Sequence, residues 1–264
     1  MRNYSIYYNP EAGSGRARAL VERLAVSSQL SAVSLSRDIV VIGGDGTFNR
    51  LLNELERPEA HRYILLPGGT SNSLYSQLSG KVTAEEKMQR YLDGADFQPI
   101  DLPELTIGGK TYRFANEAGA GFAAAIAREI ESRKTKRIFN ALHLNELAYI
   151  ATAFRCWRKD EPIMLSLCNN RRISGDLYPC PGAQINDGLI DVFELRCPRL
   201  RLPYELTRLV GAKADKASPY VTRHQTATQS WHWDKPMPVE LDGNPIGETQ
   251  DIRLSIYPSP IQVL

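Results

Sequence analysis

The sequence predicts an α/β domain with a parallel sheet, followed by a second domain of mainly antiparallel β-strands. Over about the first 95 residues, unbroken apolar runs alternate with helix-like runs, which is typical of a parallel α/β layer. A glycine-containing loop follows each of the first three apolar runs. Beyond residue 98, shorter segments alternate apolar with polar residues, and turn signals such as Gly108-Gly109 and Asn169-Asn170 separate them.

The first domain is expected to contain three strand–loop–helix units. Strands are expected at residues 6–8, 39–42 and 63–66. Their β-branched and leucine-rich runs suit strands that are buried on both faces. Helices are expected from residue 16 to about 26, from about 47 through 55, and from about 73.

The second domain is expected to begin near residue 98, where this pattern changes. Its short alternating segments predict strands at residues 105–107, 112–114, 164–167, 190–193 and 239–241. A helical pattern near residues 145–157 interrupts them.

Composition and charge narrow the classes of function. The 264 residues carry 32 basic and 30 acidic side chains, a net charge of +2, whereas nucleic-acid binding needs a clear basic excess. No apolar run approaches the roughly 20 residues that span a bilayer, and the N-terminus carries no secretory signal. The four cysteines form no C-x-x-C pair. We expect a cytoplasmic protein with no nucleic-acid partner and no transmembrane segment, which touches a membrane only peripherally.

The three glycine-containing loops predict one phosphate site. Ligands of an open parallel sheet bind outside the carboxyl ends of its strands, and the helix that follows each loop offers N–H groups to an anion. The middle loop places Asp45 where phosphates are expected. A carboxylate there would bring a divalent cation to the phosphates or take the proton of an acceptor. The alternative is that Asp45 caps the helix that begins near Thr47.

These loops resemble the motifs of the diacylglycerol kinase catalytic-domain family. Gly43-Gly44-Asp45-Gly46-Thr47 with Asn53 is similar to its G-G-D-G-T-x-x-E-x-x-N motif. The stretches at residues 9–15 and 66–72 resemble its first and third loops. Weaker similarities follow at residues 116–122 (N-x-x-G-x-G-F) and 181–192 (P-x-A-x-x-x-D-G-L-L-D-V), so the resemblance runs along nearly the whole chain.

The resemblance implies an ATP-dependent lipid kinase that uses Mg²⁺ and phosphorylates the hydroxyl of diacylglycerol or a similar lipid alcohol at a membrane surface. It implies an α/β nucleotide-binding domain at residues 1–97, joined by the C-terminal residues 257–264, and a β-sandwich-like domain at residues 98–256. Asp45 would be catalytic, and Asp242 would support it. Asp187 and the main chain of Leu189 would bind a structural metal, although Asp187-Gly188 also fits a plain hairpin turn. The residues that would bind nucleotide are Asn9, Gly13, Gly15, Gly43, Gly44, Gly46, Thr47, Gly68, Gly69, Thr70 and Asn72.

The chain departs from the family pattern at functional positions. Arg50 replaces a glutamate of the second motif, Ser73 replaces an aspartate of the third, and Asn244 replaces the glutamate of a late D-G-E motif. An asparagine amide cannot accept a proton at neutral pH. The segment at residues 27–38 also leaves no room for a further strand and helix. These departures motivate one alternative, a catalytically impaired member that senses nucleotide or lipid. An NAD kinase is a second alternative, because NAD kinases share the G-G-D-G loop and have an asparagine–acid pair that Asn116-Glu117 resembles.

Overall fold

The structure, a computed structural model, describes residues 3–10, 12–25, 36–69, 72–80, 82–131, 155–157, 163–173, 177–211, 217–257 and 260–264. The chain divides into two compact units. Unit 1 comprises residues 1–102, 185–187 and 257–264, and unit 2 comprises residues 103–184 and 188–256. Most of the helix expected near residues 145–157 lies outside the described residues. No helix of the described part of the chain has both the length and the hydropathy needed to cross a membrane.

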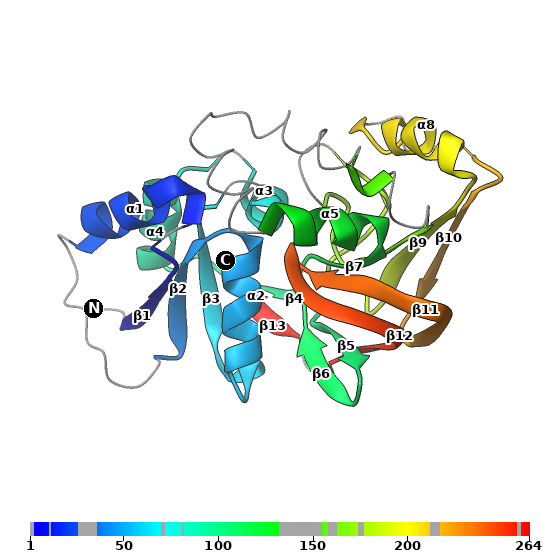
Figure 1. The fold of residues 1–264 in the computed structure, drawn as a ribbon. Coiled ribbons are helices and arrows are strands. Elements are labelled where there is room, and N and C mark those ends of the chain that lie inside the picture. The colour runs from blue at the N-terminus through cyan, green and yellow to red at the C-terminus, as the bar shows by residue number, and fades with distance from the viewer. Residues whose placement is uncertain are drawn as a thin grey trace. The chain divides into compact units, whose positions relative to one another are not determined.

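Unit 1 is built on a five-stranded sheet in the order β1-β2-β3-β13-β4 (Figure 1). The first four strands of that order are parallel, and β4 is antiparallel to β13. β2 and the middle of β3 are fully buried, as their unbroken apolar sequences predict. The strands are β1 (Tyr4–Tyr8), β2 (Asp38–Gly43), β3 (Arg62–Pro67), β4 (Gln98–Ile100) and β13 (Ile261–Val263).

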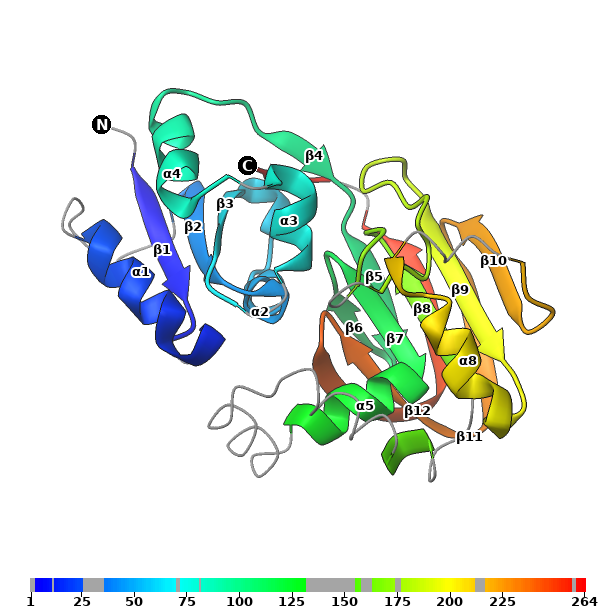
Figure 2. The same ribbon diagram turned by 90° about the horizontal axis from the view of Figure 1, so that it is seen from above.

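Helices cover both faces of this sheet (Figure 2). Apolar side chains of α1 and α4 pack with Val40, Ile42, Ile64 and Leu66 on one face, while α2 and α3 lie on the other. The helices are α1 (Arg16–Ala25), α2 (Asp45–Glu54), α3 (Ser73–Ser79) and α4 (Ala84–Leu92), and short 3-10 helices lie at η1 (Ala12–Gly15) and η2 (Pro58–Ala60). α4 begins at a reciprocal capping box, in which Thr83 and Glu86 bond to each other's backbone N–H.

A partly buried ion pair fixes the register at the amino ends of β2 and β3. Arg62 donates from Nε and Nη2 to the two carboxylate oxygens of Asp38, both at 2.6 Å, and Tyr91 donates its hydroxyl to the same carboxylate at 2.8 Å. The opposite, carboxyl ends of these strands carry the loops described below.

Unit 2 is one eight-stranded antiparallel sheet in the order β10-β9-β8-β7-β11-β12-β5-β6. One apolar core lies on each face, and α5 packs across β7, β8, β11 and β12 (Figure 1). The predicted fold class, a parallel α/β domain followed by an antiparallel β domain, is confirmed. The elements are β5 (Pro103–Ile107), β6 (Lys110–Arg113), β7 (Glu117–Gly121), α5 (Phe122–Glu131), β8 (Ile163–Cys168), β9 (Ile190–Arg196), η3 (Arg199–Arg201), α8 (Leu202–Thr207), β10 (Val221–Thr226), β11 (Gln229–Leu241) and β12 (Asn244–Ile256).

The structural division between the units falls after residue 102, a few residues beyond the predicted residue 98. β4 belongs to the sheet of unit 1 because Ile100 pairs with Ile261 of β13. Residues 257–264 belong to unit 1 as well, and Leu264 donates its N–H to the carbonyl of Tyr63 at 2.8 Å.

Candidate functional site: three loops at the carboxyl ends of the parallel strands

The second and third loops of unit 1 pack against each other backbone to backbone. The N–H of Gly68 donates to the carbonyl of Gly43 at 2.9 Å, which continues the pairing of β2 and β3 into the loops. A Cβ atom on Gly69 would lie 2.4 Å from Cα of Gly44. Glycine is therefore needed at Gly69 because the neighbouring backbone occupies the space of a side chain.

The first loop joins the other two at the same place. Gly13 has a φ of 59°, and a Cβ atom there would lie 2.2 Å from the carbonyl oxygen of Gly68. Arg16, the first residue of α1, donates from Nε to the carbonyl of Gly13 at 3.1 Å and from Nη2 to the carbonyl of Gly69 at 2.8 Å. Arg16 thus ties the first loop to the third. Arg16 was not among the predicted site residues, although a cation directly after a glycine-rich loop was the available signal.

Asp45 connects the second loop to the helix that follows the third. Its Oδ2 accepts the N–H of Ser73 at 2.8 Å, and its Oδ1 accepts the N–H of Leu74 at 3.0 Å. These are the first two residues of α3, so Asp45 caps a helix. It does not cap the helix of the alternative interpretation: Asp45 is the first residue of α2, whose N-cap Gly44 supplies no side-chain bond.

Asn72 closes the third loop upon itself. Its Oδ1 accepts the N–H of Gly69 at 3.0 Å, and its Nδ2 donates to the carbonyl of Gly69 at 3.0 Å. The backbone of Asn72 is left-handed, with a φ of 48°. Thr70, the remaining predicted residue of this loop, lies outside the described residues.

The other residues predicted to bind nucleotide lie at the same edge of the sheet. Asn9 accepts the N–H of Ala12 through its carbonyl at 3.0 Å, and Gly15 directly precedes α1 with a φ of 93°. Thr47 is buried and fills the space that a side chain of Gly43 would need. Gly46 is the second residue of α2.

Among the described residues, a small cavity lies at the second and third loops. It measures about 20 Å³ and is bordered by Gly44, Asp45, Asn72 and Tyr75, among others. A volume of this size holds about one water molecule. A nucleotide would therefore bind to the outer surface of the loops and not within this cavity.

The predicted metal and support residues lie apart from these loops in the sequence. Asp187 belongs to unit 1, whereas Leu189 and Asp242 belong to unit 2. Within the described part of the chain, no three His, Cys, Asp or Glu side chains are grouped as a metal site. Metal binding by Asp187 and Leu189 therefore stays a prediction.

Asp242 has a clear place within unit 2. Its carboxylate accepts the backbone N–H groups of Ala115, Asn116 and Glu117 at 2.9–3.0 Å, and its own backbone is left-handed, with a φ of 49°. It therefore holds the start of β7 against the turn that joins β11 to β12.

Two buried carboxyl groups next to Asp242 were not expected from the sequence. Glu117 and Glu240 are 6% and 3% exposed, and a Cβ atom on Gly119 would lie 2.6 Å from Oε1 of Glu240 and 3.4 Å from Oε1 of Glu117. Burial raises the pKa of Glu117 to about 8, and the charge of Asp242 adds to this. Burial and the charge of Glu117 raise the pKa of Glu240 well above its usual value. Burial therefore favours the protonated form of a carboxyl at this place in unit 2.

Comparisons with known proteins agree with this fold. The model of the diacylglycerol kinase catalytic domain matches residues 26–105. The protein named "Probable lipid kinase YegS-like" from Stenotrophomonas maltophilia is 27% identical, and the match covers 85% of this chain and 77% of that protein. The protein of the same name from Pseudomonas aeruginosa PAO1 is also 27% identical, with 94% and 81% covered.

Solved structures show the same architecture. The crystal structure of a diacylglycerol kinase from Bacillus anthracis Sterne has a TM-score of 0.62 at 14% identity, covering 100% of this chain and 97% of that chain. Another Bacillus anthracis Sterne structure has a TM-score of 0.68 at 16% identity, with 100% and 98% covered. The chain therefore has a diacylglycerol kinase-like fold. Its residues 26–105 match the diacylglycerol kinase catalytic domain, and along most of its length it is similar to proteins named probable lipid kinases.

Proposed function

We propose that this protein is an ATP- and Mg²⁺-dependent lipid kinase that phosphorylates the hydroxyl of diacylglycerol or a similar lipid alcohol. The observation that carries the proposal is the junction of the three loops, in which Arg16 and Asp45 bind main-chain groups of the third loop and its helix. The names of the relatives support the lipid kinase part of this proposal.

The loops fit a polyphosphate on two physical grounds. α1 and α2, each of ten residues, begin at loops of the same edge, and a helix N-terminus favours an anion. Arg16 adds a guanidinium, whose planar fork of five N–H groups suits phosphate oxygens and whose Nε and Nη2 already donate to the loops. When bound, ATP supplies the phosphoryl group, and Mg²⁺ neutralises charge on its phosphates.

The chain's own residues then have distinct roles. Gly13, Gly44 and Gly69 bring the loop backbones together, because each lacks the side chain that would separate them. Asp45 would hold the cation or accept the proton of the acceptor hydroxyl. Its two bonds to α3 fix the orientation of the carboxylate for either task.

The contacts of Asn116 and Glu117 favour the lipid kinase over the NAD kinase alternative. The Oδ1 of Asn116 accepts a hydrogen bond from Asn170, and Glu117 is buried beside Glu240. Both side chains are turned to the interior of unit 2, and neither is exposed to hold the ribose of a dinucleotide.

The test is a phosphoryl-transfer assay with the purified protein. It is incubated with γ-phosphate-labelled ATP, Mg²⁺ and phosphatidylcholine vesicles that contain diacylglycerol, and the extracted lipid is counted. We expect labelled lipid with Mg²⁺ and none with a chelator or with plain phosphatidylcholine vesicles. Binding of ATP without transfer to diacylglycerol or to a cellular lipid extract would favour the sensor alternative. Absence of both would contradict the proposal and the predicted nucleotide site.

The proposed setting is the surface of a membrane that the protein contacts from the cytoplasm. Co-sedimentation with anionic and neutral vesicles tests that part separately, since vesicle contact and phosphoryl transfer are measured independently.

A further inference from the structure

Unit 1 buries a lysine for which its described residues provide no acidic partner. Lys87 lies on α4 and is 3% exposed. Its ammonium donates to the hydroxyl of Ser79 and lies 4.7 Å from the ring centroid of Tyr75. Burial lowers the pKa of Lys87 to about 7, the positive charge of Arg90 adds to this, and no acidic side chain of the described residues offsets it. Buried charges in proteins are ordinarily paired, so this cation lacks the anion that its surroundings call for.

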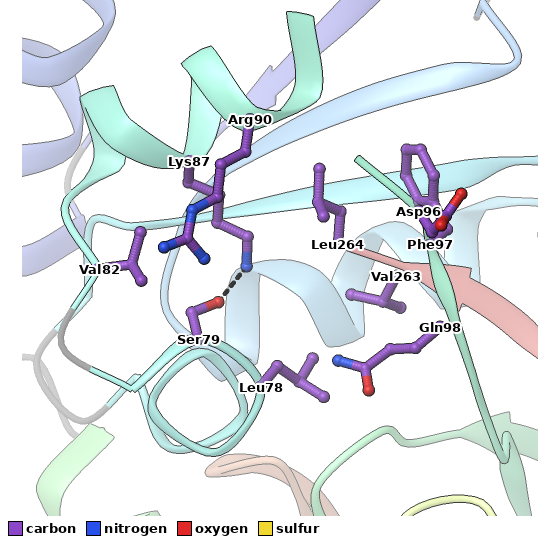
Figure 3. A pocket seen from close by; sticks show the side chains of 10 residues that line it. All are labelled: Leu78, Ser79, Val82, Lys87, Arg90, Asp96, Phe97, Gln98, Val263 and Leu264. Atoms are coloured by element: carbon purple, nitrogen blue, oxygen red, sulfur yellow. Dashed lines mark hydrogen bonds between the residues drawn. The ribbon is translucent and has the colours of Figure 1, made fainter. Parts of the chain in front are cut away.

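The lysine borders a pocket of about 290 Å³ (Figure 3). Lys87 and Arg90 extend into it from α4, and Ser79 adds a hydroxyl from the end of α3. Leu78, Val263 and Leu264 form apolar walls. One end of the pocket is thus cationic, and much of its remaining wall is apolar.

One acidic side chain borders the pocket, on the side away from the lysine. Figure 3 shows Asp96 beside Phe97, across the pocket from Lys87. Among the charged side chains of the lining, two are therefore basic and one is acidic. The volume lies near the lower limit of the roughly 300–1,000 Å³ that small-molecule sites occupy.

The pocket is separate from the phosphate loops. Asp45 binds the N–H groups of Ser73 and Leu74 at the start of α3, whereas Ser79 is the last residue of that helix. Seven helical residues span about 10 Å. A ligand against Lys87 would therefore leave the outer surface of the loops open to nucleotide.

We propose that this pocket is a second ligand site, which binds a small organic anion with a short alkyl chain. The anionic group binds Lys87 and Arg90, and the alkyl chain packs against the apolar walls. Binding supplies the missing counter-charge to Lys87 and removes apolar surface from water. The proposal does not depend on the proposed kinase reaction, because it concerns binding in a different part of unit 1.

Calorimetric titration of the full chain with hexanoate tests the proposal. Hexanoate should bind saturably and with a stoichiometry of one, and ATP should not displace it. Each methylene removed from the probe should weaken binding about fourfold, so butyrate should bind roughly 16-fold more weakly than hexanoate. Absence of saturable binding, displacement by ATP, or equal binding of acetate and hexanoate would each overturn the proposal.

Variants assign the binding to the pocket. Lys87→Met keeps the length of the side chain and removes its charge, so we expect hexanoate to bind at least tenfold more weakly. Arg18→Met removes the same charge from an exposed position on α1 and should bind hexanoate as the wild type does. If Lys87→Met does not fold, Arg90→Gln replaces it, with Arg18→Gln as the control, because Arg90 is exposed. Unchanged affinity in the pocket variant would overturn the assignment.

Discussion

The carboxylate of Asp45 accepts the backbone N–H of Ser73 at 2.8 Å, although 28 residues separate them in the sequence. The same carboxylate binds the N–H of Leu74, so the acid of the second loop holds the helix of the third. Any change at Asp45 therefore alters both the site and the packing of α3. Experiments on this residue have to separate these two effects.

We expect Asp45→Ala to lower the free energy of unfolding by about 2 kcal/mol, because two N–H groups of α3 lose a charged acceptor. Asp45→Asn should cost about half as much, since its amide keeps one oxygen. Both variants should lose phosphoryl transfer by about 10² or more at a temperature where both are folded. Denaturant unfolding and transfer rates measure the two effects.

Glu22→Gln is the control for this charge change, because Glu22 is exposed on α1. It should match the wild type in both assays. If Asp45→Asn transfers the phosphoryl group at close to the wild-type rate, Asp45 acts only as a helix cap.

The close contact of the second and third loops predicts a large effect of Gly69→Ala. Its Cβ atom would lie 2.4 Å from Cα and 2.8 Å from N of Gly44, and both are backbone atoms. Relieving such contacts costs about 1–3 kcal/mol and should push the two loops apart. Unfolding free energy and ATP affinity should therefore fall together.

Gly182→Ala is a suitable comparison, since a Cβ atom there meets nothing within 4 Å and its φ is not positive. Its stability should stay within about 0.5 kcal/mol of the wild type. A Gly69→Ala variant as stable as Gly182→Ala would mean that the loops separate freely.

Arg16→Lys should weaken nucleotide binding more than it weakens folding. A lysine keeps the positive charge, but its ammonium is a point charge without the planar fork that reaches Gly13 and Gly69 together. We expect about a tenfold loss of ATP affinity and a loss of about 1 kcal/mol or less in stability, because Arg16 is exposed. Arg18→Lys, on the same helix, is the control and should change neither the affinity for ATP, measured by titration, nor the free energy of unfolding.

The parts of the fold that could be predicted are those that depend on residues close to one another in the sequence. The buried runs before Gly43 and Pro67 indicate strands, and the loops after them must meet because parallel strands share one carboxyl edge. The bond from Asp45 to α3 could not be predicted, since it joins two loops whose fit depends on their packing. The alternative interpretation of Asp45 as a helix cap was right about the kind of contact, but the helix that it caps is α3 and not α2.

Strand alternation also explains why Glu240 was missed. Val239 and Leu241 are apolar, so a period of two places Glu240 on the opposite face, where a polar residue is normally solvated. Here α5 packs across β11, and both faces of the sheet have an apolar core. The predicted boundary between the domains fell a few residues too early for another reason. β4 belongs to the first domain through its pairing with β13, which lies at the far end of the chain.

The buried pair of Glu117 and Glu240 makes the stability of unit 2 depend on pH. The pKa of Glu117 rises from 4.5 to about 8 on folding, so between these values the folded state keeps a proton that the unfolded state has lost. The contribution of this group is fully present below about pH 4.5 and is lost as the pH rises towards 8. Between about pH 4.5 and pH 8, this one group lowers the free energy of unfolding by about 1.4 kcal/mol for each unit by which the pH rises.

The Glu117→Gln variant isolates this contribution, because glutamine does not titrate. Urea unfolding at pH 5, 6, 7 and 8 should show the wild type losing stability relative to Glu117→Gln as the pH rises. Glu104→Gln serves as the control, since Glu104 lies in the same unit and pairs with Arg113 near the surface. Its unfolding curve should run parallel to that of the wild type. If the curve of Glu117→Gln is parallel as well, the carboxyl of Glu117 does not hold a proton in the folded protein over this range of pH.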